Sequence, residues 1–305
     1  MSTWKAGGIT LPNGPFMIGA GVCKNPESTR GWLKIAPVVS GSYTAEQRDG
    51  NSGQVWYPDS LEEFLETGYG LNAYGMPNMG FAAAAAELKC IESEQPLIVS
   101  IAGFSTDDYI AGVKTFVTLQ NVAAIELHFG CPNTEHGPPI SFEPDVIDTI
   151  VNAVMQLGHS VPIWIKLSPY SNTKELEKVA HVLNKFVCKD TFQIAVVTSN
   201  TFPSAFVDER AVTALGGLAG LSGPALKPIA LGQVKQLRKH LDHTIDVIGV
   251  GGITTGNDVV DFLEAGATAV QTTSLAHAAG HPNTFNNHFF DEGAANRLFE
   301  LLETN

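Results

Sequence analysis

Residues 126–133 read Glu-Leu-His-Phe-Gly-Cys-Pro-Asn, an apolar strand pattern that runs into a glycine, a cysteine and a turn fixed by proline. This order predicts that the thiol of Cys131 lies on a loop at the carboxyl end of a buried strand. In an α/β barrel, the catalytic side chains come from the loops at that end. The stretch therefore favours an α/β barrel with Cys131 at its working end.

Short apolar runs alternate with helical patterns along the whole chain, which is typical of repeated βα units. Eight such units over 305 residues predict a (β/α)8 TIM barrel of the α/β class, formed as a single domain over residues 1–305. Residues 43–78, rich in Gly, Pro, Tyr and Asn, are interpreted as an elaborated loop over the barrel mouth. We expect strands at 15–20, 36–42, 97–102, 122–129, 162–167, 193–199, 245–250 and 268–272. We expect helices at 27–35, 79–92, 106–119, 144–157, 173–187, 227–241, 256–265 and 286–303.

Composition excludes several kinds of protein. With 18 basic and 31 acidic residues the net charge is −13, which argues against a nucleic-acid partner because phosphate binding needs clustered Lys and Arg. The chain shows no signal peptide and no unbroken apolar stretch of about 18 residues, so we expect a cytoplasmic protein that does not enter a membrane. The cysteines form no CxxC pair, which argues against a disulfide scaffold, a zinc site or an iron–sulfur cluster; they are Cys23, Cys90, Cys131 and Cys188.

Three histidines near the end of the chain raise the question of a metal. His277 and His281 are four residues apart and His288 follows, but no nearby acidic motif completes a ligand set. We therefore predict no metal site.

The last two expected strands end in loops suited to a phosphate. Gly251 and Gly252 open the way to the helix at 256–265, where backbone N–H groups and the helix dipole favour an anion. Thr273 and Ser274 bring hydroxyl groups to the end of the next strand. Loops after strands seven and eight are the usual phosphate site of these barrels, so we predict phosphate binding here.

Lys166 ends the apolar strand Pro-Ile-Trp-Ile-Lys-Leu. A lysine that emerges from a buried strand is costly unless it meets an anion, although a stem that reaches out to solvent would also explain it. We favour an anionic ligand.

Taken together, these stretches resemble dihydroorotate dehydrogenases from about residue 8 to about residue 277. Those enzymes are flavin mononucleotide (FMN) barrels that oxidise a dihydropyrimidine, and their soluble class uses a cysteine as the base. The matching segments include Ile18-Gly-Ala-Gly-Val22, Arg48-Asp-Gly-Asn51, Leu71–Phe81, Thr198-Ser-Asn-Thr201 and Leu221-Ser-Gly-Pro-Ala-Leu-Lys-Pro228.

The resemblance assigns roles to individual residues. Cys131 would be the catalytic base. FMN would contact Ala20, Gly21, Ser42, Lys166, Val197, Ser222, Gly223, Gly251, Gly252, Thr273 and Ser274. The substrate would contact Asn72, Gly75, Met76, His128, Asn133, Asn200 and Thr201.

Two substrate-side positions depart from the family pattern. Gly41 stands where the soluble class usually has a lysine that touches both FMN and substrate, and His128 stands where it has an asparagine. Gly130 also replaces a serine. These changes predict weaker binding of dihydroorotate, partly restored if His128 is protonated. Gly41→Lys would tighten orotate binding if the pocket still serves orotate, and would have no effect if it serves another ligand.

The leading hypothesis is an FMN oxidoreductase that converts dihydroorotate to orotate in pyrimidine biosynthesis. The alternatives are an FMN oxidoreductase acting on another dihydropyrimidine or unsaturated compound, a flavin-binding protein without turnover, and a phosphate-binding barrel without redox chemistry. No NAD motif is visible, so the electron acceptor would be a small molecule or would act through a separate subunit. Relatives of this class imply a homodimer.

Overall fold

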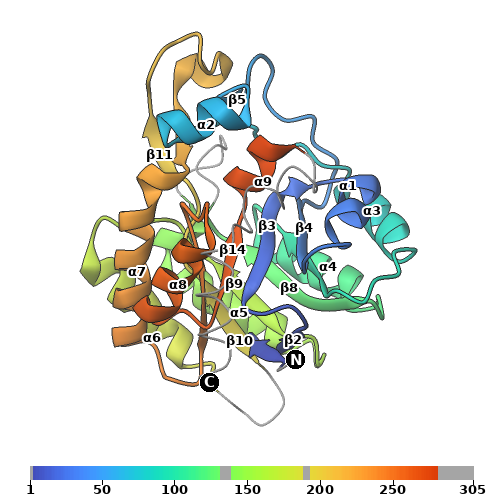
Figure 1. Ribbon diagram of the computed structural model, residues 1–305. Coiled ribbons are helices and arrows are strands. Elements are labelled where there is room, and N and C mark those ends of the chain that lie inside the picture. The colour runs from blue at the N-terminus through green and yellow to red at the C-terminus, as the bar shows by residue number, and fades with distance from the viewer. Residues whose placement is uncertain (1–2, 131–138, 188–192, 281–305) are drawn as a thin grey trace.

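The structure, a computed structural model, describes residues 3–130, 139–187 and 193–280 (Figure 1). Its centre is a closed barrel in which eight strands pair in parallel, in the order β10-β13-β14-β3-β4-β7-β8-β9. Each of these strands overlaps one of the ranges expected from the sequence, so the TIM-barrel prediction is confirmed. The barrel strands are β3 (Phe16–Cys23), β4 (Val38–Tyr43), β7 (Leu97–Ile101), β8 (Val122–His128), β9 (Ile163–Lys166), β10 (Ile194–Val197), β13 (Asp246–Val250) and β14 (Ala269–Thr272).

Helices surround the barrel at the expected places. α4 and α8 begin with capping boxes, at Ser105 with Asp108 and at Thr255 with Asp258, which satisfy backbone N–H groups at the helix start. The expected helix at 286–303 lies outside the described residues. The outer helices are α1 (Pro26–Trp32), α3 (Gly80–Leu88), α4 (Thr106–Phe116), α5 (Pro144–Met155), α6 (Thr173–Asn184), α7 (Lys227–His240) and α8 (Gly256–Ala265). Within the described ranges, no helix has the length and apolar character needed to cross a membrane.

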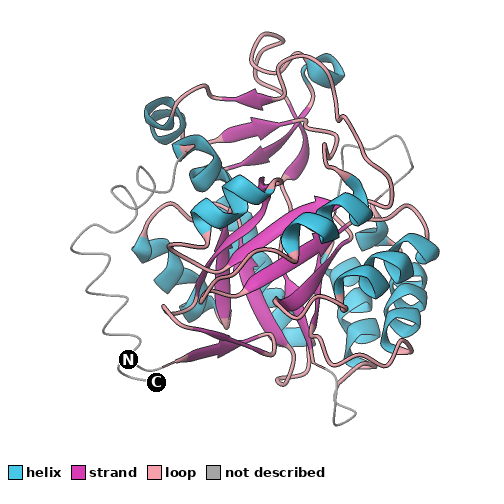
Figure 2. Ribbon diagram, turned by 90° about the vertical axis from the view of Figure 1, so that its right-hand side faces the viewer, coloured by secondary structure: helices cyan, strands magenta, loops and turns pink. Residues whose placement is uncertain are grey.

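An N-terminal hairpin covers the amino end of the barrel. It consists of β1 (Trp4–Ala6) and β2 (Ile9–Leu11) and lies at the bottom of Figure 2. Trp164 Nε1 donates to the Gly7 carbonyl at 2.8 Å, and the Gly7 N–H donates to the Asp246 carboxylate at 2.6 Å. This hairpin was not predicted from the sequence. Because it covers the amino end, the site lies at the carboxyl end of the barrel.

A small cap covers the carboxyl end. Residues 43–78, expected to be a long loop, contain three regular elements: β5 (Trp56–Tyr57), α2 (Leu61–Thr67) and β6 (Gly70–Asn72). These strands join β11 (Phe202–Ala205) and β12 (Ala219–Ser222) in a four-stranded antiparallel sheet, seen at the top of Figure 2. A short helix, α9 (Ser274–Ala279), follows the last barrel strand and packs on α2. The pairing of Asn72 with Gly220 joins distant parts of the chain, so no local pattern could reveal it.

Candidate active site

A pocket lies between the carboxyl ends of the barrel strands and the cap. It brings together most of the residues assigned from the sequence, although Val197 lies in the packed barrel interior with Ile248 and is not on the pocket wall. Cys131 and Asn133 lie outside the described residues. The expected cofactor residues on the wall are Ala20, Gly21, Ser42, Lys166, Ser222, Gly223, Gly251, Gly252, Thr273 and Ser274. The expected substrate residues on the wall are Asn72, Gly75, Met76, His128, Asn200 and Thr201.

One part of the wall is backbone, because no side chain would fit there. Gly252 has φ +79°, and a Cβ at this position would lie 2.7 Å from the backbone nitrogen of Lys227 and 2.8 Å from the carbonyl oxygen of Gly223. Gly251 has φ +125°, a conformation that favours glycine. The loops at 222–223 and 251–252 therefore meet backbone to backbone. Such close-packed peptide groups suit a phosphate, as the sequence predicted.

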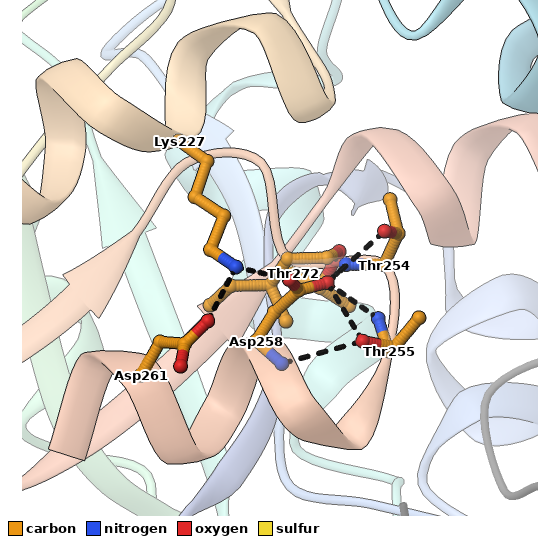
Figure 3. Close-up of polar contacts among 7 residues, drawn as sticks. Lys227, Thr254, Thr255, Asp258, Asp261 and Thr272 are labelled. Atoms are coloured by element: carbon orange, nitrogen blue, oxygen red, sulfur yellow. Dashed lines mark hydrogen bonds and ion pairs between the residues drawn. The ribbon is translucent and has the colours of Figure 1, made fainter. Parts of the chain in front are cut away.

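Side chains of the protein hold the loop after β13, residues 251–255, in place (Figure 3). The Asp258 carboxylate accepts from the backbone N–H groups of Thr254 and Thr255 at 2.8 and 2.7 Å. Lys227 Nζ lies 2.5 Å from Asp258 and 2.6 Å from Asp261, which joins α7 to α8. Burial raises the pKa of Asp258, but the hydrogen bonds from Lys227 and the two threonines outweigh it and leave the pKa below its usual value.

The neighbouring strand end is tied to the same loop. The Thr272 hydroxyl donates to the Ile253 carbonyl at 2.8 Å. We call the contacts of Lys227, Thr254, Thr255, Asp258, Asp261 and Thr272 the loop clamp.

A buried ion pair lies beside the pocket. Lys166 Nζ is 3.9 Å from Glu126 Oε1, and their side chains are 5% and 0% exposed. Glu126 also accepts hydrogen bonds from the Ser100 hydroxyl at 3.0 Å and from Gln271 Nε2 at 3.1 Å. Lys166 was predicted from the sequence, but Glu126 was not. A carboxylate in the apolar run 122–128 is also costly to bury without a partner, so the same reasoning could have identified it.

His128 is neutral rather than protonated. Its Nδ1 lies 3.2 Å from the Ser42 hydroxyl and its Nε2 lies 3.3 Å from Asn200 Nδ2. Burial, and then the nearby Lys166 ammonium, lower the pKa of His128 to about 3. A protonated His128, which was expected to help hold a carboxylate, is therefore disfavoured at neutral pH.

Gly41 and Gly130 are glycines for steric reasons. Gly41 has φ +114°, and a Cβ there would lie 2.5 Å from the carbonyl oxygen of Ser100. A Cβ at Gly130 would lie 2.9 Å from the carbonyl oxygen of Leu167. A lysine at position 41 would displace β4 from β7, so Gly41→Lys does not test the pocket as the sequence suggested.

A cluster at the pocket wall was not predicted. Lys24, the residue after β3, places its Nζ 4.5 Å from the centre of the Tyr74 ring. The Tyr74 hydroxyl lies 2.5 Å from His277 Nε2, and the His277 ring packs edge-on against Trp56 at 4.5 Å. Burial, and then Lys24, lower the pKa of His277 to about 4.

The position of Lys24 at the carboxyl end of an apolar run could have identified it. His277 thus contacts Tyr74 and Trp56. His281 and His288, which were considered with His277 as metal ligands, lie outside the described residues.

The pocket residues fit FMN. The clamped loop with Gly251 and Gly252 suits the phosphate, and Lys166 brings a cation to the wall. Gln271 Oε1, also on the wall, is buried and has no hydrogen-bond partner among the described residues. A buried acceptor of this kind is costly unless a donor meets it, and the flavin ring carries such an N–H.

Comparisons with known proteins agree with the fold and the site. The family model for dihydroorotate dehydrogenase matches residues 1–286. Dihydroorotate dehydrogenase A (fumarate) of Limosilactobacillus reuteri is 32% identical over 273 residues, which cover 87% of this chain and 83% of that protein. The catalytic subunit of dihydroorotate dehydrogenase B (NAD(+)) of Listeria welshimeri is 34% identical over 249 residues, 79% of this chain and 76% of that protein.

A solved structure shows the same fold. The crystal structure of the Eimeria tenella dihydroorotate dehydrogenase in complex with ferulenol has a TM-score of 0.77 at 19% identity, and the match covers 99% of this chain and 84% of that one. The match to the family model and the two sequence relatives lead to one conclusion: the chain belongs to the dihydroorotate dehydrogenase family.

Proposed function

We propose that the protein is an FMN-dependent oxidoreductase that converts dihydroorotate to orotate, a step of pyrimidine biosynthesis. The observation that carries this proposal is one pocket, in a member of this family, that combines a clamped phosphate loop, the buried Lys166 and the amide of Asn200. The oxidation removes a proton from C5 and a hydride from C6 of the ring. Bound FMN would supply the acceptor for the hydride.

The protein's own residues would bind and orient the ring and remove the proton. Cys131 is the proposed base, and it follows Gly130, whose carbonyl accepts a hydrogen bond from Asn200 on the pocket wall. Asn72, Asn200 and Thr201 line the pocket with groups that donate and accept, which suits a ring whose edge alternates carbonyls and N–H groups.

The flavin spectrum tests this function directly. The purified protein is expected to be yellow, to release FMN on denaturation, and to lose its flavin absorbance when mixed anaerobically with dihydroorotate. Release of another flavin would contradict the cofactor assignment. A bound FMN that dihydroorotate never reduces would contradict the substrate assignment.

The electron acceptor and the oligomeric state are also proposals. The relatives' names mention fumarate in one case and NAD(+) in the other, and we propose either a small acceptor of this kind or one reached through a separate subunit. We further propose a cytoplasmic homodimer. Exposed apolar side chains of the segment 206–218 offer a contact surface for it, namely Phe206, Val207, Leu215 and Leu218.

We also propose that Lys24 replaces the cation missing at Gly41. Lys24 follows β3, the strand that pairs with β4, and its side chain lines the pocket. It packs on Tyr74, directly before Gly75 and Met76, whose backbone is proposed to hold the substrate. Met76 has φ +60°, an unusual conformation for a side-chain-bearing residue and one that often marks a binding site.

Lys24→Ala is expected to weaken orotate binding by about 10-fold, at the lower end of what a hydrogen bond to a charged group contributes, because Lys24 is only partly buried. Titration of the flavin absorbance with orotate measures this dissociation constant. Lys34→Ala, which removes an exposed lysine of the next segment, is the matched control and should leave binding unchanged. An unchanged dissociation constant in Lys24→Ala would show that the carboxylate is held elsewhere.

A further inference from the structure

A chain of hydrogen bonds leads from the barrel interior to His128. It begins at Glu126, which accepts from Gln271 Nε2 at 3.1 Å and faces Lys166 Nζ at 3.9 Å. An amide donor and an ammonium both favour the ionised carboxylate, which can only accept. Ser100 therefore gives its single hydroxyl proton to Glu126 Oε1, across 3.0 Å.

The count of protons fixes each later link. Ser42 Oγ lies 2.8 Å from Ser100 Oγ, and because the proton of Ser100 is committed to Glu126, Ser42 is the donor of this pair. Ser42 then has no proton left for His128 Nδ1, which lies 3.2 Å away. Nδ1 of His128 must carry the hydrogen, and the lone pair belongs to Nε2.

The other side of the imidazole ring gives the same answer independently. The Thr201 N–H donates to Asn200 Oδ1 at 2.8 Å, which fixes the orientation of this amide. Asn200 therefore turns Nδ2, a donor, toward the Gly130 carbonyl and toward His128 Nε2 at 3.3 Å. A donor facing Nε2 requires an acceptor there. At this distance the contact is weak, so a stronger donor can take up the lone pair of Nε2.

We propose that His128 is held as its Nδ1–H tautomer and presents Nε2 as an acceptor for a ring N–H of the substrate, which makes it a specificity-determining residue for cyclic amides and ureides. The substrate half of this proposal rests on the proposed function. The asparagine of the resembling class offers the substrate both a donor and an acceptor, whereas this imidazole offers it only the acceptor Nε2. A carboxylate or carbonyl oxygen placed against Nε2 would meet a lone pair and be disfavoured.

The surroundings keep the ring neutral over a wide pH range. Among the described residues, the charged group that acts on the ring is Lys166 on β9, which is paired with Glu126, and the polar groups that contact it are Ser42 and Asn200. With its pKa lowered to about 3, the ring should hold one tautomer from about pH 5 to about pH 9, across the range in which an ordinary histidine titrates.

The tautomer can be read without any substrate. Long-range proton–nitrogen NMR spectra of the FMN-bound protein, labelled with nitrogen-15 in histidine, should show one ring with a protonated Nδ1 and an unprotonated Nε2 that does not titrate. His128→Asn identifies this signal. Ser100→Ala frees the Ser42 proton for Nδ1 and should admit the other tautomer. Ser40→Ala removes a buried serine of β4, the strand of Ser42, that bonds to Tyr43 instead, and it should not admit the other tautomer. An Nε2–H tautomer in the native protein would overturn the proposal.

Ligand binding tests the substrate half. His128→Leu is expected to weaken orotate binding about 10-fold, whereas His128→Asn, whose amide oxygen can accept, should retain most of it. One of the two N-methyl derivatives of orotate should bind the native protein more weakly than orotate does. The same derivative should bind His128→Leu no more weakly than it binds the native protein. An equal loss for all three ligands in His128→Leu would contradict the N–H contact. Failure of orotate to bind the native protein would overturn the proposed substrate, while the NMR result would still decide the tautomer.

Discussion

Cys131→Ala is expected to leave FMN bound and to slow flavin reduction by dihydroorotate by ~10²-fold or more, the usual contribution of a positioned general base. Another group cannot readily take its place. His128 lines the same pocket, but its pKa of about 3 makes it a poor base at neutral pH. Lys166 is occupied with Glu126.

Anaerobic stopped-flow mixing, with flavin absorbance as the signal, measures the rate of reduction. Cys131→Ser should keep part of the rate, because a hydroxyl can serve as a weaker base, and membrane-bound relatives use serine. Cys90→Ala removes an exposed cysteine and is the control. Native reduction kinetics in Cys131→Ala would remove this thiol from the mechanism.

Lys166→Ala is expected to lower the free energy of unfolding by about 3 kcal/mol, the lower end of the range for breaking a buried ion pair. The strand core does not depend on this ammonium, so we expect flavin reduction to suffer more than folding. Folding is nevertheless affected, because the substitution leaves Glu126 as a fully buried carboxylate without its cation. The loss should stay at the lower end because Ser100 and Gln271 still donate to Glu126.

Urea unfolding, followed by intrinsic fluorescence, gives this free energy. Lys185→Ala breaks the ion pair with Asp148, whose side chains are 50% and 28% exposed, and should cost less than about 1 kcal/mol. Adding Glu126→Gln to Lys166→Ala removes the stranded charge and should recover much of the stability, but not the rate of flavin reduction. Equal stability of Lys166→Ala and the native protein would show that the pair contributes nothing to folding.

The barrel was predictable because its strands are short, apolar and separated by helices with local signals. The caps at Ser105 and Thr255 mark where helices begin, and such patterns need no knowledge of distant residues. The cap sheet and the N-terminal hairpin were missed for a physical reason. The strand at 70–72 is stabilised by residues 219–222, and a strand of this length carries no periodicity of its own.

The pocket divides in the same way. Gly251 and Gly252, which line the pocket, could be predicted because consecutive glycines after a strand form a local pattern. Glu126 and Lys24 were missed because their importance comes from partners on other elements. The lowered pKa of His128 also depends on its environment, namely on burial and on Lys166, so the sequence alone left its protonation state open.

The loop clamp bears on how the apoprotein meets its cofactor. Asp258 and Lys227 tie the loop at 254–255 to α7 and α8 through hydrogen bonds and ion pairs within the chain, so we expect it to keep its shape when FMN is absent. Association with FMN should then lose little conformational entropy at this end of the site, because these contacts already order the loop. We therefore expect FMN to exchange by binding to a loop that is already formed, without refolding of this part of the chain.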